Sequence, residues 1–193
     1  MKIEIRAQEV NISGYVNATG KPSNPVITPH GKVIEVIRPH AFEKALDRNG
    51  DISLTLDHDS THIYADTKDG SLQLYEDRIG LHADVTITDP DLISLAKQGK
   101  IKGWSFGMYN VKDSMEERRE GLPVRTITDM DIDHITLVVN KCPVYSAMSV
   151  EVRAGEEKEI ETRRLNIKPQ LAFRYDNSAY IQRLNKIKRE VNK

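Results

Sequence analysis

A serine between two glycines is the residue of this sequence whose setting best suits nucleophilic chemistry. The segment Gly103-Trp104-Ser105-Phe106-Gly107 predicts a strand, in which successive side chains point to opposite faces. Trp104, Phe106 and Met108 then share one face, which belongs in a core. Ser105 lies on the other face between two positions without side chains, where a substrate backbone can approach closely. Ser105 is therefore a candidate nucleophile, although glycines in a strand also mark bulges or tight packing.

A nucleophilic serine needs a neutral base, and His58 is the candidate. His58 ends a predicted strand over residues 51–58, and the other residues on its face of that strand are apolar. The edge of an apolar core disfavours a charged imidazole, which keeps the base able to accept a proton. Asp57 and Asp59 are expected to point to the opposite face. The alternative is a histidine with a purely structural role.

His134 is the candidate for the third member of a triad. It lies on the predicted strand 132–139, and it could hold His58 in its working tautomer by accepting a hydrogen bond. The neighbouring Asp133 is expected to face away, because strand side chains alternate. A structural histidine is again the alternative.

Two other kinds of site deserve comparison with a serine site. His62 follows His58 by four residues, but the local pattern is a strand entering a turn and no further ligands are near, so no metal site is expected. Cys142 could be a thiol nucleophile paired with His134, although a lone cysteine is more often a small buried hydrophobe. The glycines of 99–107 lack the spacing and the lysine of a phosphate-binding loop.

The elements that must position these residues are short strands with few helices. Helices are expected over 41–46 and after Asp89-Pro90-Asp91, where Asp89 can cap, Pro90 suits the first helical position and Gly99 can end the helix. A long loop is expected over 17–31 and a solvated loop or hairpin tip over 112–120. The strands are expected at 3–5, 12–16, 32–37, 51–58, 71–75, 81–87, 101–111 and 132–139. This pattern favours a mostly β fold, a barrel or sandwich with helices at its edges.

Bulk composition excludes several classes of function. The chain has 193 residues and a net charge of -1, which gives no overall attraction to nucleic acid or to an anionic membrane. Its apolar stretches are too short to span a bilayer, and no signal peptide is expected. A single cysteine allows no intrachain disulfide, so a reducing cytoplasm is the expected compartment.

The sequence divides near residue 152. Residues 153–159 predict a polar linker, and residues 180–191 have apolar side chains at helical spacing. We therefore expect a domain over 1–152 and an arm over 153–193 that ends in an amphipathic helix. The arm is predicted to be a removable targeting or scaffold-contact segment.

Four segments, read in order, resemble the prohead proteases of tailed double-stranded DNA phages, a family similar in fold to the herpesvirus protease assemblin. Residues 33–42 resemble the family's strand ending in Pro-Gly-Ala-Phe, with His40 where glycine is usual. Residues 54–59 look like the segment with the catalytic histidine, and residues 99–108 look like the serine segment. Residues 134–138, followed by Pro143 and Ala147, resemble the family's Glu-Val-Ser-Leu-Val segment and the proline after it, with His134 where an acidic residue is frequent.

The resemblance covers roughly residues 1–152. It implies a herpesvirus-protease-like β-barrel flanked by helices and a serine endopeptidase that needs no cofactor. It also implies action on major capsid and scaffold protein, and on the chain itself, inside the immature capsid in the host cytoplasm. Assemblins use Ser-His-His and are active as dimers, so Ser105, His58 and His134 are the expected catalytic residues and a homodimer is possible. The backbone amides of Phe106 and Gly107 are candidates for the oxyanion hole.

A non-enzymatic capsid-assembly or interaction module on the same barrel is the main alternative function. Such a module need not bring Ser105 and His58 together, whereas a nucleophile and its base must come within hydrogen-bond reach. A separation above about 6 Å between the two would favour the module.

Overall fold

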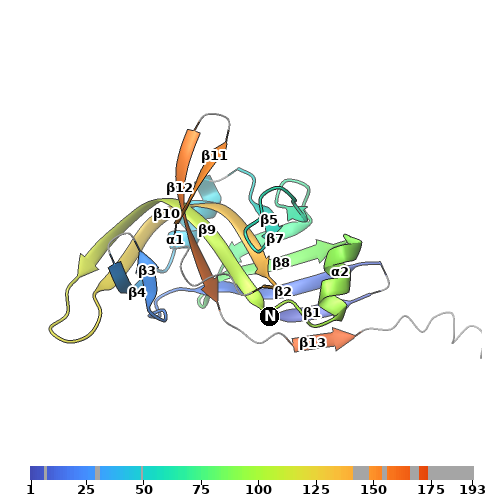
Figure 1. Ribbon diagram of the computed structural model, residues 1–193, viewed down its shortest axis with the longest axis horizontal. Helices are drawn as coiled ribbons and strands as arrows, with labels where there is room; N and C mark the ends of the chain where they lie inside the picture. Colours follow the sequence, from blue (N-terminus) through green and yellow to red (C-terminus); the bar gives the residue numbers. More distant parts are fainter. Residues whose placement is uncertain are drawn as a thin grey trace, which may run out of the picture.

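The strands of the protein form two sheets, which we describe from a computed structural model (Figure 1). The structure describes residues 1–6, 8–28, 31–48, 50–140, 148–153, 156–165 and 170–173. In chain order the elements of these residues are β1 (Lys2–Ile5), β2 (Val10–Ala18), β3 (Val26–Thr28), β4 (Gly31–Ile37), α1 (Ala41–Arg48), β5 (Ser53–Leu56), β6 (Ala65–Asp66), β7 (Leu72–Glu76), β8 (Gly80–Ile87), α2 (Pro90–Lys97), β9 (Gly103–Glu116), β10 (Val124–Val138), β11 (Met148–Arg153), β12 (Glu156–Leu165) and β13 (Gln170–Phe173).

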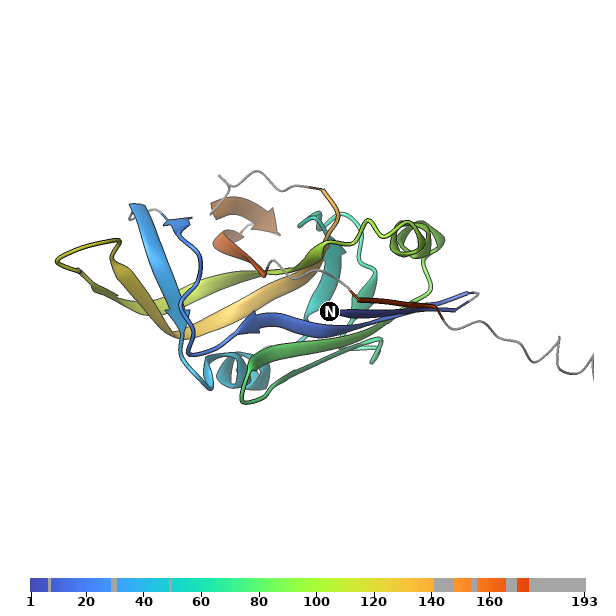
Figure 2. The ribbon, with the colours of Figure 1, turned by 90° about the horizontal axis from the view of Figure 1, so that it is seen from below.

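The first sheet has the order β13-β1-β2-β8-β7, and the second has the order β11-β12-β9-β10-β4-β3. β9 pairs with one side of β10, and two parallel strands share the other side. β4 pairs with the first part of β10 and β5 with its last part. β13 lies alongside β1, although the two are far apart in the sequence (Figure 2). The described strands form no closed barrel, which corrects the expectation of a herpesvirus-like barrel.

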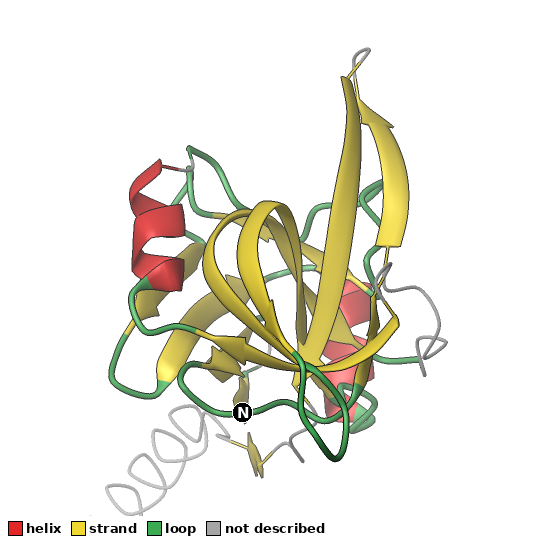
Figure 3. Ribbon diagram, turned by 90° about the vertical axis from the view of Figure 1, so that its left-hand side faces the viewer, coloured by secondary structure: helices red, strands yellow, loops and turns green. Residues whose placement is uncertain are grey.

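The core lies between the sheets, where β2 packs against β9. Trp104, Phe106 and Met108 contribute one face of β9 to this core, and each is at most 1% exposed, as the alternation predicts. α1 packs on β10 and β7, and α2 packs on β1, so the strands lie between the two helices (Figure 3). The buried hydrophobic residues of this core run from Ile3 to Val139.

Both helices begin as the sequence predicts. The Asp89 side chain accepts a hydrogen bond from the Leu92 amide at 2.9 Å and caps α2, while Pro90 takes the first helical position. Gly99 follows the helix with a φ of 65°, in the left-handed region that glycine tolerates. No helix in the described part of the chain is long and apolar enough to cross a bilayer.

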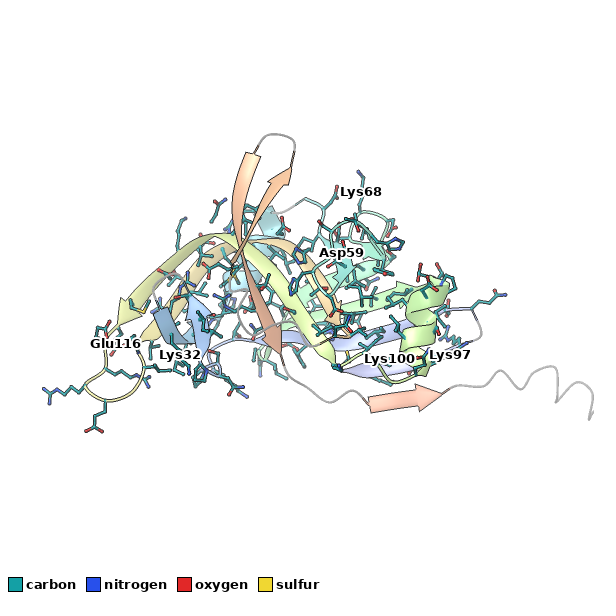
Figure 4. All side chains as sticks on the ribbon, in the orientation of Figure 1. Lys32, Asp59, Lys68, Lys97, Lys100 and Glu116 are labelled. Carbon is teal, nitrogen blue, oxygen red and sulfur yellow. The ribbon has the colours of Figure 1, made fainter. Side chains whose placement is uncertain are left out.

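The strands differ from the prediction mainly in length. β9 and β10 continue into the charged segment as a long hairpin, and Glu116 lies at its outer end (Figure 4). The predicted loop over 17–31 contains the end of β2 and all of β3. These stretches are polar because both faces of a protruding strand meet water, so composition alone does not distinguish them from loops.

The predicted polar linker is in part a strand. Residues 156–165 form β12, which pairs antiparallel with β9, the strand that carries Ser105. Backbone hydrogen bonding gives a polar segment a place in a sheet even where its side chains show no strand pattern. The predicted helix over 180–191 lies outside the described residues.

Candidate active site

Ser105 lies in the middle of the second sheet. In β9 it is paired with Thr136 of β10 on one side and with Arg164 of β12 on the other. Its side chain is on the face that the sequence predicts, but the residue is only 1% exposed. The side chain contacts His58 and the Arg163 carbonyl of β12, two neighbours that the alternation of β9 alone does not reveal.

His58 reaches Ser105 from a tight turn and not from the strand that the sequence predicts. β5 ends at Leu56, and the Asp59 amide donates a hydrogen bond of 2.9 Å back to the Leu56 carbonyl. The two residues between them, Asp57 and His58, have φ values of 50° and 65°, as in the tight turns that connect hairpin strands.

The end of β10 holds this turn in place. The Asp57 carboxylate accepts hydrogen bonds from the Val139 and Asn140 amides, at 2.9 and 3.0 Å. The His58 amide donates to the Thr136 hydroxyl at 3.0 Å. Asp57 is therefore a positioning residue of the turn, and its carboxylate is turned to these amides and not to the imidazole.

His134 contacts the other side of the His58 ring. The distance from His58 Nε2 to Ser105 Oγ is 2.9 Å, and that from His58 Nδ1 to His134 Nε2 is 2.7 Å. His58 thus lies between Ser105 and His134, within hydrogen-bond distance of both, and the three residues come from β9, the turn after β5 and β10. The separation of Ser105 and His58 lies well below the distance that would favour a non-enzymatic module.

Asp133 extends this series, contrary to the expectation that it faces away. Asp133 Oδ2 lies 2.7 Å from His134 Nδ1. The register between β9 and β10 shifts between Ile132 and His134, which makes Asp133 the extra residue of a β-bulge. A bulge breaks the alternation and re-aims a side chain, so strict alternation missed this contact. The signal in the sequence that could have revealed this contact was an acidic residue directly next to His134.

The carboxylate determines how the protons are arranged. The Asp133 carboxylate can only accept a hydrogen bond, so it favours the tautomer of His134 with hydrogen on Nδ1. Nε2 of His134 is then an acceptor. His58 accordingly donates from Nδ1, which leaves its Nε2 unprotonated toward Ser105. Burial, and in second place the nearby His134, lowers the pKa of His58 to about 4, although Asp57 acts in the opposite direction. His58 is therefore neutral near pH 7.

The Ser105 hydroxyl has a second acceptor, the backbone carbonyl of Arg163 in β12. A hydroxyl has a single proton to donate, so this carbonyl competes with His58 for it. β12 thus places a second hydrogen-bond acceptor at the Ser105 hydroxyl, in addition to His58.

A buried cluster of charges lies at the same junction. Glu35 of β4 and Arg125 of β10 are each 3% exposed, and they pair with Arg163 and Glu161 of β12. Sequence reasoning missed this cluster. The signal was Glu35, an acidic residue with the same parity as the buried Val33 and Ile37 in an apolar strand.

The remaining predicted residues have different positions. Phe106 and Gly107 both pair with β10 on one side and β12 on the other. The His62 ring is exposed and lies 3.6 Å from Asp89. Among the described residues no three potential ligands are grouped to hold a metal ion. Cys142 lies outside the described residues, so the thiol alternative is not addressed by the geometry.

A family model described as caudovirus prohead serine protease matches residues 1–163 of the chain. No curated protein and no solved structure matches the chain.

Proposed function

Since the chain belongs to the family of caudovirus prohead serine proteases, we propose that it is the serine endopeptidase that cleaves major capsid and scaffold protein during prohead maturation. Ser105 is the proposed nucleophile and His58 its base. The observation that carries this assignment is the 2.9 Å contact between Ser105 Oγ and His58 Nε2 in a buried setting that keeps the base neutral.

The proposed reaction is acyl transfer in two steps. His58 Nε2 takes the proton of Ser105 as Oγ attacks the peptide carbonyl carbon, and the proton then passes to the leaving amine as the C–N bond breaks. Water attacks the acyl-enzyme, gives one proton to His58, and releases the carboxyl product and the free serine. His134 stabilises the charged His58 as a hydrogen-bond acceptor, and Asp133 supports His134.

The backbone amides of Phe106 and Gly107 remain the proposed oxyanion hole. Both residues pair with strands on either side, so an amide engaged by β12 would become available once β12 is displaced. This proposal therefore ties oxyanion stabilisation to the removal of that strand.

The test is the mass of the purified protein after days at moderate concentration, compared with Ser105→Ala, and the same pair incubated with the phage's capsid and scaffold proteins. Cleavage by the wild type alone would support a serine protease and, if the chain itself is cut, self-processing. His134→Ala should retain more activity than Ser105→Ala, because it removes a supporting group and leaves the nucleophile and base.

Two other results would count against the proposal. Intact protein in every incubation, capsid substrates included, would favour the non-enzymatic capsid-assembly module. Equal cleavage by the wild type and Ser105→Ala would show that another protease is responsible and would remove the support for Ser105.

A further inference from the structure

β12 occupies the position that a peptide substrate would need. In the second sheet it is the neighbour of β9, the strand that carries Ser105 (Figure 1). Its carbonyl at Arg163 contacts the Ser105 hydroxyl. A peptide that adds a strand to the edge of a sheet binds through its main chain, while pockets for alternate side chains determine its specificity. β12 pairs with β9 in this manner from Glu161 to Leu165.

Two alternate side chains of β12, Glu161 and Arg163, enter the charged cluster. Arg163 bonds both oxygens of Glu35, from Nε to Oε2 and from Nη2 to Oε1 at 2.7 Å. Glu161 bonds two nitrogens of Arg125, with Oε2 2.5 Å from Nη1 and Oε1 2.8 Å from Nη2. Each pair is bidentate, which gives geometric specificity as well as affinity.

Glu35 and Arg125 also contact each other, with 3.0 Å between Oε1 and Nη1, and Arg125 Nε contacts Asp113. Without β12, the body contributes Glu35, Asp113 and Arg125 to the cluster, which leaves one net negative charge at a buried place. That charge favours a cation next to Glu35. The guanidinium of Arg163 supplies it, and Glu161 pairs with the buried guanidinium of Arg125.

We infer that Glu35 and Arg125 form the specificity site of the protease. This site binds an extended peptide in which a glutamate stands two residues before an arginine, and the peptide is cleaved after that arginine. The inference rests on the proposed function and adds its substrate class. β12, with Glu161-Thr162-Arg163, occupies this site in the same chain. The Arg163 carbonyl is the one at Ser105 Oγ, so the corresponding bond of a substrate joins that arginine to the next residue.

In the hydrolysis of such a substrate, Oγ of Ser105 bonds to the carbonyl carbon of the arginine and the bond to the following nitrogen breaks. That nitrogen leaves as an amine with the proton that His58 carried. Water then releases a peptide ending in arginine. No other reactant is required.

Binding of a labelled peptide tests the site separately from chemistry. The probe is a fluorescent peptide with the sequence of residues 160–165, and its control has glutamine in place of the first arginine. The protein is the full chain with Ser105→Ala and Arg163→Ala, so that β12 loses its anchor and no cleavage occurs. We expect the arginine peptide to bind about 30-fold more tightly, since a desolvated charged pair is at stake.

Glu35→Gln in the same background should abolish this preference, because it keeps the shape of the side chain and removes its charge. Glu9→Gln, a half-buried glutamate paired with Arg6, is the matched control and should leave the preference unchanged. Cooperative thermal unfolding shows that each variant is folded. Equal affinity for both peptides, or a preference that survives Glu35→Gln, would overturn the inference.

The same peptides offered to the Arg163→Ala chain with Ser105 intact separate the two proposals. Cleavage after the first arginine supports both. Cleavage that depends on Ser105 but ignores that arginine overturns the specificity site and leaves the protease. Selective binding with no Ser105-dependent cleavage of any substrate supports the recognition site and contradicts the proposed function.

If Arg163→Ala does not fold, the wild type and Glu35→Gln can be compared on unfolded protein substrates by sequencing the new termini. Arginine before the cut in the wild type, lost in Glu35→Gln, supports the specificity site. The same cut sites in both proteins would overturn it.

Discussion

At the scale of single residues, the site depends on which imidazole nitrogen carries a proton. With Asp133 at His134 Nδ1, the His134 ring donates to Asp133 and accepts from Nδ1 of His58. Nε2 of His58 is then unprotonated and faces Ser105. The Asp133 carboxylate contacts His134 and not His58, the proposed base. It acts through His134, which makes Asp133 a positioning residue.

Asp133→Asn tests this tautomer argument. The asparagine amide can donate to His134 Nδ1, which would favour the opposite tautomer and reverse the hydrogen bond to His58. We expect kcat/KM to fall by about 10- to 100-fold while KM changes little, because a tautomer defect affects the reaction more than peptide binding. Asp131→Asn on the same strand is the control. Equal losses in the two variants would contradict the role of Asp133.

His58 also makes stability depend on pH. Its pKa is about 4 in the folded protein and 6.5 in an ordinary setting, so between these values the unfolded chain binds more protons. The contribution of the neutral His58 to the free energy of unfolding is therefore complete above about pH 6.5 and is lost as the pH falls toward 4. One pKa unit is worth about 1.4 kcal/mol, so the free energy of unfolding should drop by about 2 kcal/mol between pH 6.5 and pH 5 on this account.

Urea denaturation at about pH 7 and about pH 5 measures this effect. His58→Gln should lose correspondingly less stability on acidification than the wild type, whereas His62→Gln, whose ring is exposed, should behave as the wild type does. An equal acid effect in all three proteins would show that His58 is not the group responsible.

At the scale of elements, the turn after β5 determines where His58, the proposed base, lies. Asp57 and His58 both have positive φ, a conformation that costs non-glycine residues energy unless other contacts hold it. The hydrogen bonds of Asp57 to the end of β10 supply those contacts. His40 likewise has a φ of 66°, which accounts for the glycine that the resembling family has there.

Asp57→Ala should therefore destabilise the protein by about 1–3 kcal/mol, because it leaves the amide of the buried Val139 without its acceptor. Activity should fall as well, since His58 loses its fixed position. Denaturation and kcat/KM measure the two effects. Asp51→Ala, an exposed aspartate, should change stability by less than about 0.5 kcal/mol. If both variants unfold alike, the turn is held by other contacts.

At the scale of the whole molecule, the core and the C-terminal strands have separate roles. Among the side chains that the structure describes, the hydrophobic core runs from Ile3 to Val139. β12 and β13 add backbone pairing to the two sheets, and β12 adds the charged pairs of Glu161 and Arg163. The proposal of a folded body with a removable C-terminal segment is consistent with this division. Within this segment, the Arg163 carbonyl of β12 also accepts a hydrogen bond from the Ser105 hydroxyl.

A chain that ends at residue 153 should still unfold cooperatively, at a temperature about 10 °C below that of a chain that ends at residue 173. The loss reflects the buried pairs of Glu161 and Arg163 and the pairing of β12, worth a few kcal/mol. Ser105 in the shorter chain should react faster with a fluorophosphonate. Thermal denaturation and labelling measure the two properties, and a shorter chain without a cooperative transition would contradict the division.

The sequence by itself determined the residues of the series and the local elements around them. Ser105, His58 and His134 stand out by side-chain type and by alternation, and the caps and glycines of the helices have local causes. Local patterns also give the mostly β class, because they depend on neighbours in the chain. They do not give a closed barrel, since closure depends on how distant strands pair.

The tertiary structure decided what lies next to these residues. Asp133 joins the site through a bulge that exists only in the register of β9 against β10, and His58 reaches Ser105 from a turn held by the end of β10. β12 has no apolar pattern, so its place on β9 and the pairing of Arg163 with Glu35 follow from long-range hydrogen bonds and complementary charge. The pair of Arg163 and Glu35 joins residues 128 positions apart, and β12 pairs with a strand that lies far from it in the sequence, so no periodicity along the chain encodes these interactions.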